Sequence, residues 1–328
     1  MNHKPLAIVL GEPYSTFQEI ILKSLKNKKI SKFKRPLLFI GCSDLFKKQM
    51  LKLSYSYKIN IIKLNELKKI KKNKNIINFI DINFKYKKIF DKISSKSNSN
   101  INKYFSVALN LLKEKKVFGM INGPISKKHF LKKNYLGITE YLKVKANKNY
   151  KPVMLIYNPI LSVSPITTHL PIKDVAKKIN KKDIISNVIA INKFYKEKLK
   201  KKPTIGILGL NPHCETVSKF SEEEKIIIPS IRNLIKKKVN IEGPFPADTF
   251  FLKRNINKYD VVIGMYHDQV LTPIKTLFNF NAINITLGLP FLRVSPDHGT
   301  NNKMIGLKKS DNSSFITAID FFKKINAN

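Results

Sequence analysis

The sequence has little cysteine, few acidic residues and no long apolar run, and each shortage excludes a class of protein. The only cysteines among the 328 residues are Cys42 and Cys214, and neither lies in a C-x-x-C pair. Two isolated cysteines are typical of a reducing compartment and not of a disulfide-stabilised secreted fold. The apolar runs, such as LAIVL at 6–10, are much shorter than the roughly 18–20 residues that cross a membrane. No signal-peptide pattern is present, so we expect a cytoplasmic protein with no membrane partner.

The shortage of acidic residues gives the chain a formal net charge of +40, from 62 basic and 22 acidic residues. Such a charge is common in nucleic-acid-binding proteins, and this function stays open as an alternative from another class. Arginine, which favours paired contacts with phosphates and bases, is rare here, however. The lysines are spread along the chain among Asn and Ile, as in NELKKIKKNKNIINFIDINFKYKKIF. We interpret them as a compositional bias on a solvated surface and expect no specific nucleic-acid partner.

Two nucleotide-binding motifs are also missing. No GxGxxG follows the first apolar run, where the chain reads GEPYSTFQE at 11–19, and no GxxxxGK[ST] occurs. These absences exclude a Rossmann fingerprint and a P-loop, so any nucleotide must bind by another route.

The chain does contain short apolar runs that alternate with amphipathic, lysine-rich segments. Continuous apolar runs separated by helical segments predict an α/β fold with mostly parallel sheets covered on both faces. Residues 92–103, KISSKSNSNINK, are the most loop-like stretch. The predicted strands are 6–10, 36–41, 117–123, 152–157, 161–169, 204–213, 261–267 and 282–288. The predicted helical segments are 16–25, 104–116, 172–199 and 221–238.

Three of the six histidines close three of these apolar runs: His169, His213 and His267. Ligands of open α/β sheets collect at the carboxyl ends of the strands, so the three imidazoles could converge on one point. Three histidines with an open position form a common site for a divalent metal. Each histidine alone could be structural, but the matching positions of all three favour a metal site.

Other polar residues follow strand ends or lie in Gly/Pro-interrupted segments. Asp248 lies in GPFPADTFF, whereas Asp268 and Lys275 follow His267 closely. Asn284 and Arg293 lie in NITLGLPFLRVSPDHGT. Lysine and arginine around a metal suit a small anionic substrate that carries phosphate or carboxylate.

Taken in order, these motifs resemble the 4-hydroxythreonine-4-phosphate dehydrogenases of pyridoxine (vitamin B6) biosynthesis. The resemblance extends from end to end of the chain. The matching stretches are GEP (11–13), NGPISK (122–127), GITEYL (137–142), TTHLPIKDV (167–175), GLNPH (209–213), GPFPADT (243–249), MYHDQ (265–269), PIK (273–275) and NITLGLPFLRVSPDHGT (284–300).

The resemblance implies an isocitrate-dehydrogenase-like, two-domain α/β/α fold. We place the first domain at 1–129 plus 296–328 and the second, with most site residues, at 130–295. The family works as a homodimer with active sites at the subunit interface. It uses NAD or NADP without a Rossmann fingerprint to oxidise 4-phosphooxy-L-threonine at C3. The product then loses CO₂ and becomes 3-amino-2-oxopropyl phosphate.

The resemblance also implies roles for individual residues. His169, His213 and His267 match the ligands of one divalent ion, such as Zn²⁺, Mg²⁺ or Co²⁺, contributed across the dimer. The matching substrate contacts are Thr139, Lys275, Asn284 and Arg293. The general base stays open among Asp248, Asp268 and Lys275.

Two departures from the family pattern bear on the substrate. The family reads GHTE where this chain has GITE, so Ile138 replaces a substrate-binding histidine. The family's GEPAGIGPE has become GEPYSTFQE, with the loss of two glycines and their freedom to adopt positive φ. A related dehydrogenase of a 4-phospho-threonate or erythronate is therefore the main alternative, and a degenerate scaffold without catalysis is another.

Overall fold

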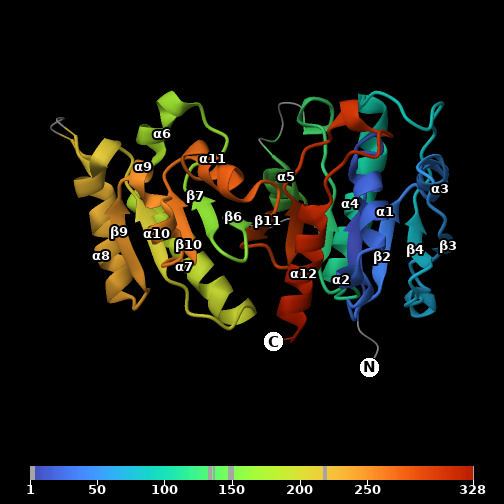
Figure 1. The fold of residues 1–328 in the computed structure, drawn as a ribbon, viewed down its shortest axis with the longest axis horizontal. Coiled ribbons are helices and arrows are strands. Elements are labelled where there is room, and N and C mark those ends of the chain that lie inside the picture. The colour runs from blue at the N-terminus through green and yellow to red at the C-terminus, as the bar shows by residue number, and fades with distance from the viewer. Residues whose placement is uncertain (1–3, 132–134, 136, 147–150, 217–219, 328) are drawn as a thin grey trace. The chain divides into compact units, whose positions relative to one another are not determined.

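The computed structural model describes residues 4–131, 135, 137–146, 151–216 and 220–327. These residues form two compact units, one from 1–150 with 289–326 and the other from 151–288. We call them unit 1 and unit 2 and describe each by itself (Figure 1). The domain boundaries expected from the sequence, at 129/130 and 295/296, stay a prediction.

Unit 1 contains a parallel sheet with strand order β3-β4-β2-β1-β5-β12. Its strands are β1 (Leu6–Val9), β2 (Leu37–Gly41), β3 (Lys58–Ile61), β4 (Ile76–Asp81), β5 (Met120–Asn122) and β12 (Arg293–Pro296). Its helices are α1 (Phe17–Leu25), α2 (Lys28–Ser31), α3 (Ser43–Lys52), α4 (Asn98–Lys113), α5 (Ile138–Lys145) and α12 (Ser313–Ala327), with short turns at Leu67–Lys69, Ser95–Ser97, Lys127–Leu131 and Asn302–Met304.

Both ends of the sequence contribute to the core of unit 1. Phe17 on α1 packs edge-on against Phe315 on α12, with ring centroids 5.7 Å apart. The central strands are completely buried, as is usual for a parallel sheet with helices on both faces. On α4, the apolar positions Ile101, Phe105 and Ala108 follow the helical period and are all buried.

Unit 2 contains a mixed sheet with strand order β11-β6-β7-β10-β8-β9. Strands β7, β10, β8 and β9 are parallel, whereas β6 runs antiparallel to both of its neighbours. The strands are β6 (Val153–Tyr157), β7 (Ser162–Pro165), β8 (Ile205–Leu208), β9 (Ile241–Phe245), β10 (Val261–Gly264) and β11 (Ile283–Leu287). The helices are α6 (Ile172–Lys178), α7 (Lys181–Lys198), α8 (Ile228–Lys236), α9 (Ala247–Phe250), α10 (Lys253–Ile256) and α11 (His267–Phe278), with short turns at Pro212–Cys214 and Glu223–Ile227.

The predicted α/β class with mostly parallel sheets is confirmed. One local prediction was wrong in part: 92–97 contain only a short turn, as a loop would, but α4 begins at Asn98, six residues before the predicted helical segment at 104–116. Among the described residues no helix is both long and apolar enough to span a membrane. The buried polar side chains of the described chain include Arg293 but no lysine, which agrees with a solvated lysine surface.

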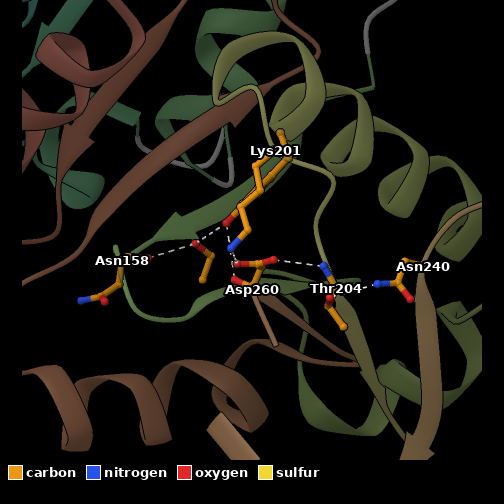
Figure 2. A network of polar contacts seen from close by, with 7 residues as sticks. Asn158, Lys201, Thr204, Asn240 and Asp260 are labelled. Carbon is orange, nitrogen blue, oxygen red and sulfur yellow. Dashed lines mark hydrogen bonds and ion pairs between the residues drawn. The ribbon is translucent and has the colours of Figure 1, made fainter. Parts of the chain in front are cut away.

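A polar network links the amino ends of three strands of unit 2 (Figure 2). The carboxylate of Asp260, just before β10, pairs with Lys201 and accepts the backbone N–H of Thr204 at 3.1 Å. Asn240, just before β9, donates to Thr204 Oγ1 at 2.9 Å. The network therefore holds β8, β9 and β10 together and leaves the carboxyl ends, where ligands collect, to other residues.

Candidate active site

The three predicted metal-binding histidines lie beyond the carboxyl ends of three strands of unit 2. His169 follows β7, His213 follows β8, and His267 is the first residue of α11, just after β10. Because β7, β10 and β8 are parallel neighbours, these ends lie at the same edge of the sheet. The sequence-based placement of all three residues at strand ends is therefore correct, although each strand ends a few residues before its histidine.

The structure brings two of the histidines together. The β7–β10 pairing continues past both strands, since Ile166 N–H donates to Gly264 O at 2.8 Å. Thr167 then donates twice to Met265 O, from its N–H at 3.1 Å and from Oγ1 at 2.8 Å. As a result, the rings of His169 and His267 lie 5.9 Å apart between centroids, at an interplanar angle of 36°.

Asp268 orients the second histidine of this pair. One carboxylate oxygen, Oδ1, lies 2.6 Å from His267 Nδ1. A neutral imidazole that donates from Nδ1 to a carboxylate keeps the lone pair on Nε2, which can then bind a metal. The Asp268 side chain is 79% exposed, so the charge of this pair is screened by solvent and contributes little to stability.

His213 lies on a separate loop after β8 and is exposed. Its φ of 54° and the φ of 62° at Cys214 are left-handed, an uncommon conformation for two consecutive non-glycine residues. Within the described part of the chain, no three His, Cys, Asp or Glu side chains lie close enough to hold a metal ion. A single chain therefore presents a histidine pair, and the three-histidine metal site stays a prediction.

The donor chemistry of the pair nevertheless suits a divalent ion of intermediate softness. Imidazole nitrogen is a common ligand of zinc and its neighbours, and a carboxylate behind the imidazole is the usual supporting contact. His169 and His267 would therefore hold such an ion together with at least one further donor. The sequence analysis placed Asp268 next to His267 but gave it only as a candidate base, so it did not predict that Asp268 supports the imidazole.

Arg293 is the main candidate for anion binding in unit 1. It is 0% exposed, and its Nε donates to Asn122 Oδ1 at 2.6 Å. Burial lowers the pKa of the guanidinium to about 9, an effect that the negative charge of Glu140 partly opposes. A desolvated arginine gains more than a solvated one from binding phosphate or carboxylate. Asn122, at the end of β5, belongs to the NGPISK motif but was not among the predicted site residues.

Thr139 and the departure at Ile138 lie in the first turn of α5. Ile138 is partly buried and packs against the apolar core cluster that contains Tyr141 and Leu142. The family's histidine position is therefore occupied here by a side chain that contributes to the core. Thr139 is half-buried beside it.

The other predicted site residues are dispersed over unit 2. Lys275, in the last turn of α11, has its Nζ 5.4 Å from the centre of the Phe280 ring. Asn284 lies on β11, and its buried Oδ1 has no hydrogen-bond partner among the described residues. Asp248 is exposed on the one-turn helix α9, directly after Pro246.

Glu12 is a buried carboxyl group that the sequence did not single out. It lies in the altered loop after β1, it is 0% exposed, and it accepts a hydrogen bond from Ser97 Oγ at 3.2 Å. Burial raises its pKa to about 7, although this hydrogen bond and one from the backbone of Tyr14 oppose the shift. The GEP motif marked the position, but no pattern in the sequence shows that its carboxyl group is desolvated.

The chain matches the family model described as pyridoxal phosphate biosynthetic protein PdxA over residues 32–322. It is 37% identical to a 4-hydroxythreonine-4-phosphate dehydrogenase from a Sulfurihydrogenibium species, over 96% of each chain. It is 31% identical to a putative D-threonate 4-phosphate dehydrogenase from Oceanobacillus iheyensis, over 97% of each chain.

Among solved structures, the chain resembles a putative 4-hydroxythreonine-4-phosphate dehydrogenase from Salmonella typhimurium, with a TM-score of 0.84 and 28% identity. The alignment covers 98% of this chain and 99% of that one. The fold, the order of the motifs and the length of the alignments all agree, and the chain belongs to the PdxA family of pyridoxal phosphate biosynthetic proteins.

Proposed function

We propose that this protein is a 4-hydroxythreonine-4-phosphate dehydrogenase that uses NAD or NADP and a divalent metal. It oxidises 4-phosphooxy-L-threonine at C3, and the product then loses CO₂ to give 3-amino-2-oxopropyl phosphate. The observation that carries the proposal is the full-length identity of 37% with a relative of that name. The paired rings of His169 and His267 at one sheet edge support it, because this reaction benefits from a Lewis acid.

The substrate carries a phosphate and a carboxylate, and the chain offers positive and polar groups to both. Arg293 is held by Asn122, so it would bind an anion with little loss of side-chain freedom. Lys275 supplies a second cation, and Thr139 and Asn284 supply neutral hydrogen-bonding groups. The orphaned Oδ1 of Asn284 is suited to accept a hydrogen bond from the substrate's ammonium or hydroxyl group.

The reaction requires three changes at the substrate. The C3 hydroxyl gives up its proton, and C3 transfers a hydride to the nicotinamide ring. The resulting β-keto acid then loses its carboxylate as CO₂, and C2 takes up a proton in its place. A divalent ion held by His169 and His267 would supply Lewis acidity for both stages. Because Asp268 is engaged with His267, we assign it the role of orienting that imidazole, and Asp248 and Lys275 remain the candidate bases.

We further infer that the active enzyme is a homodimer in which His213 of one protomer serves the histidine pair of the other. Within one described chain, no third His, Cys, Asp or Glu side chain joins His169 and His267 closely enough to hold a metal. His213 is exposed, as a residue that reaches into a partner's site must be. Analytical ultracentrifugation tests the dimer, and a sedimentation coefficient of a monomer at assay concentration would contradict it.

A second candidate is the oxidation of D-threonate 4-phosphate. The relative from Oceanobacillus iheyensis carries that name and covers nearly the whole chain at 31% identity. Ile138 packs against the core. The chain therefore lacks the hydrogen-bond donor with which the family's histidine would bind 4-phosphooxy-L-threonine. The lower identity makes this the weaker of the two proposals.

Substrate-dependent formation of NADH or NADPH tests the proposed function. The purified protein is assayed with 4-phosphooxy-L-threonine after treatment with EDTA, and again after Zn²⁺, Co²⁺, Mn²⁺ or Mg²⁺ is added back. We expect activity to disappear with the chelator and to return with at least one metal. Full activity in EDTA would contradict the metal requirement, and no activity with any metal would contradict the substrate.

A further inference from the structure

Glu223 is a buried carboxylate that the proposed reaction does not use. It is 1% exposed, at the start of the short turn Glu223–Ile227 in unit 2. Its Oε1 accepts the backbone N–H groups of Leu210 and Asn211 at 2.8 and 2.9 Å. Its Oε2 accepts Asn211 Nδ2 at 2.9 Å and Ser221 Oγ at 3.2 Å. Both oxygens are therefore fully engaged, which is how a protein stabilises a carboxylate away from water.

These hydrogen bonds act on the loop that carries His213. Leu210 and Asn211 lie just before the left-handed pair His213 and Cys214. Each left-handed non-glycine residue costs about 1–3 kcal/mol and persists only where the surroundings impose it. The ionised state suits this role: burial alone would raise the pKa of Glu223, but the hydrogen bonds from Asn211 and Leu210 hold it below its usual range.

The packing around Glu223 leaves the loop little freedom. A Cβ added to Gly209 would lie 2.7 Å from Cys214 Sγ and 3.2 Å from Glu223 Oε1. Only glycine therefore allows the end of β8, the turn at Cys214 and the Glu223 carboxylate to approach so closely.

Gln269 connects the same loop to the helix that begins with His267. Its Nε2 donates to Gly209 O at 2.7 Å, and its Oε1 accepts Met265 N–H at 2.7 Å. Gln269 is 8% exposed, so both bonds are shielded from water. The start of the His213 loop and the segment just before His267 are thus held at a fixed separation by one amide.

We propose that Glu223 is a positioning residue, which imposes the left-handed turn at His213 and thereby presents this imidazole for metal binding. The proposal rests on the proposed function in one respect, the role of His213 as a ligand. Glu223 touches neither substrate nor metal. It acts through the backbone of Leu210 and Asn211, at the start of the loop that Gln269 ties to the segment just before His267 of the same chain.

The sharpest test replaces Glu223 with glutamine, which has nearly the same shape. In glutamine an NH₂ group replaces one of the two carboxylate oxygens, each of which accepts two hydrogen bonds in the parent. At least one of these four bonds must therefore be lost, because the NH₂ group then faces an N–H donor of the loop. Glu224→Gln is the matched control, because Glu224 is exposed and adjacent in the sequence. Co²⁺ affinity of the full-length protein, measured by isothermal titration calorimetry, is the readout, with circular dichroism to verify the fold.

We expect Glu223→Gln to weaken Co²⁺ binding about 10- to 100-fold, the usual effect of losing a group that orients a ligand, while Glu224→Gln leaves it unchanged. A double-mutant cycle with His213→Ala shows whether Glu223 acts through His213. In the His213→Ala background, Glu223→Gln should weaken binding by less than twofold.

The possible failures point to different causes. If His213→Ala leaves Co²⁺ affinity unchanged, the ligand role of His213 fails, and with it that part of the proposed function. If His213→Ala weakens binding but Glu223→Gln does not, the positioning role is overturned. The positioning role is also overturned if Glu223→Gln weakens Co²⁺ binding by the same factor in the His213→Ala background as in the parent. Should Glu223→Gln fail to fold, Asn211→Ala carries the test: it removes one of the four bonds, and an affinity equal to that of the parent would overturn the proposal.

Discussion

Replacing Glu12 with glutamine should make the free energy of unfolding depend less on pH, by an amount that follows from the burial of this residue. Glu12 is completely buried, and burial raises its pKa from 4.5 to about 7. Between these two values the folded state keeps a proton that the unfolded state releases. The free energy of unfolding therefore falls as the pH rises through this window. The stabilising contribution of protonated Glu12 is complete below pH 4.5 and is lost as the pH passes 7.

The size of the effect follows from the shift. A difference of about 2.5 pKa units corresponds to about 3 kcal/mol, since one unit is 1.36 kcal/mol. Glutamine resembles the protonated carboxyl group in shape and can still accept the hydrogen bond from Ser97. The window from pH 5 to pH 8 contains most of this shift, so the parent should lose about 2.5 kcal/mol more than Glu12→Gln does across it.

Urea denaturation of both proteins at pH 5, 6, 7 and 8 measures this difference, because all other titrating groups cancel in the comparison. Glu114→Gln is the matched control: Glu114 is an exposed carboxylate paired with Lys116, and its replacement should leave the difference near zero. A difference below about 1 kcal/mol for Glu12→Gln, or one of opposite sign, would refute the assignment of a desolvated carboxyl group.

Three further substitutions test other parts of the structure. Arg293→Met should raise KM for 4-phosphooxy-L-threonine about 100-fold or more, since hydrogen bonds to charged groups are worth about 1.5–3 kcal/mol each. Its free energy of unfolding should fall by no more than about 1–3 kcal/mol, because Asn122 Oδ1 loses its donor while the desolvation of a buried charge is relieved. Ile138→His should raise kcat/KM on that substrate roughly tenfold and lower the free energy of unfolding by about 1–3 kcal/mol through lost core packing. An unchanged kcat/KM would favour the D-threonate substrate. Asp260→Ala should lower the free energy of unfolding by about 1–3 kcal/mol, because it leaves Thr204 N–H without its acceptor. Co²⁺ affinity should stay within twofold of the parent, since Asp260 lies at the amino ends of the strands and the histidines follow their carboxyl ends. A large loss of affinity would contradict that separation.

The sequence predicted the parts of the fold that depend on long apolar runs. The alternation of such runs with amphipathic segments sufficed for the α/β class, and it located β1, β2 and β10 closely. It missed β4 and the first turns of α4, for different reasons. The strand at Ile76–Asp81 lies in a lysine- and asparagine-rich region that hides its apolar residues. Helix α4 begins in a serine- and asparagine-rich stretch, because these residues also occur at helix starts.

The candidate site was predictable to a similar degree. Histidines after parallel strands must lie at one edge of a sheet, and this argument correctly placed His169 and His267 near each other. The sequence could not show that Asp268 orients His267, since adjacent residues can point in many directions. Nor could it single out Glu223 among three consecutive glutamates, because only the fold decides which of them is buried.

The most direct measurement of the central claim compares two substrates under identical conditions. Initial rates of NADH or NADPH formation are recorded with 4-phosphooxy-L-threonine and with D-threonate 4-phosphate, using the metal that restores activity after EDTA treatment. We predict a kcat/KM at least tenfold higher for 4-phosphooxy-L-threonine, with one CO₂ and one 3-amino-2-oxopropyl phosphate formed for each nicotinamide reduced. A higher kcat/KM for D-threonate 4-phosphate would contradict the claim, as would the absence of CO₂.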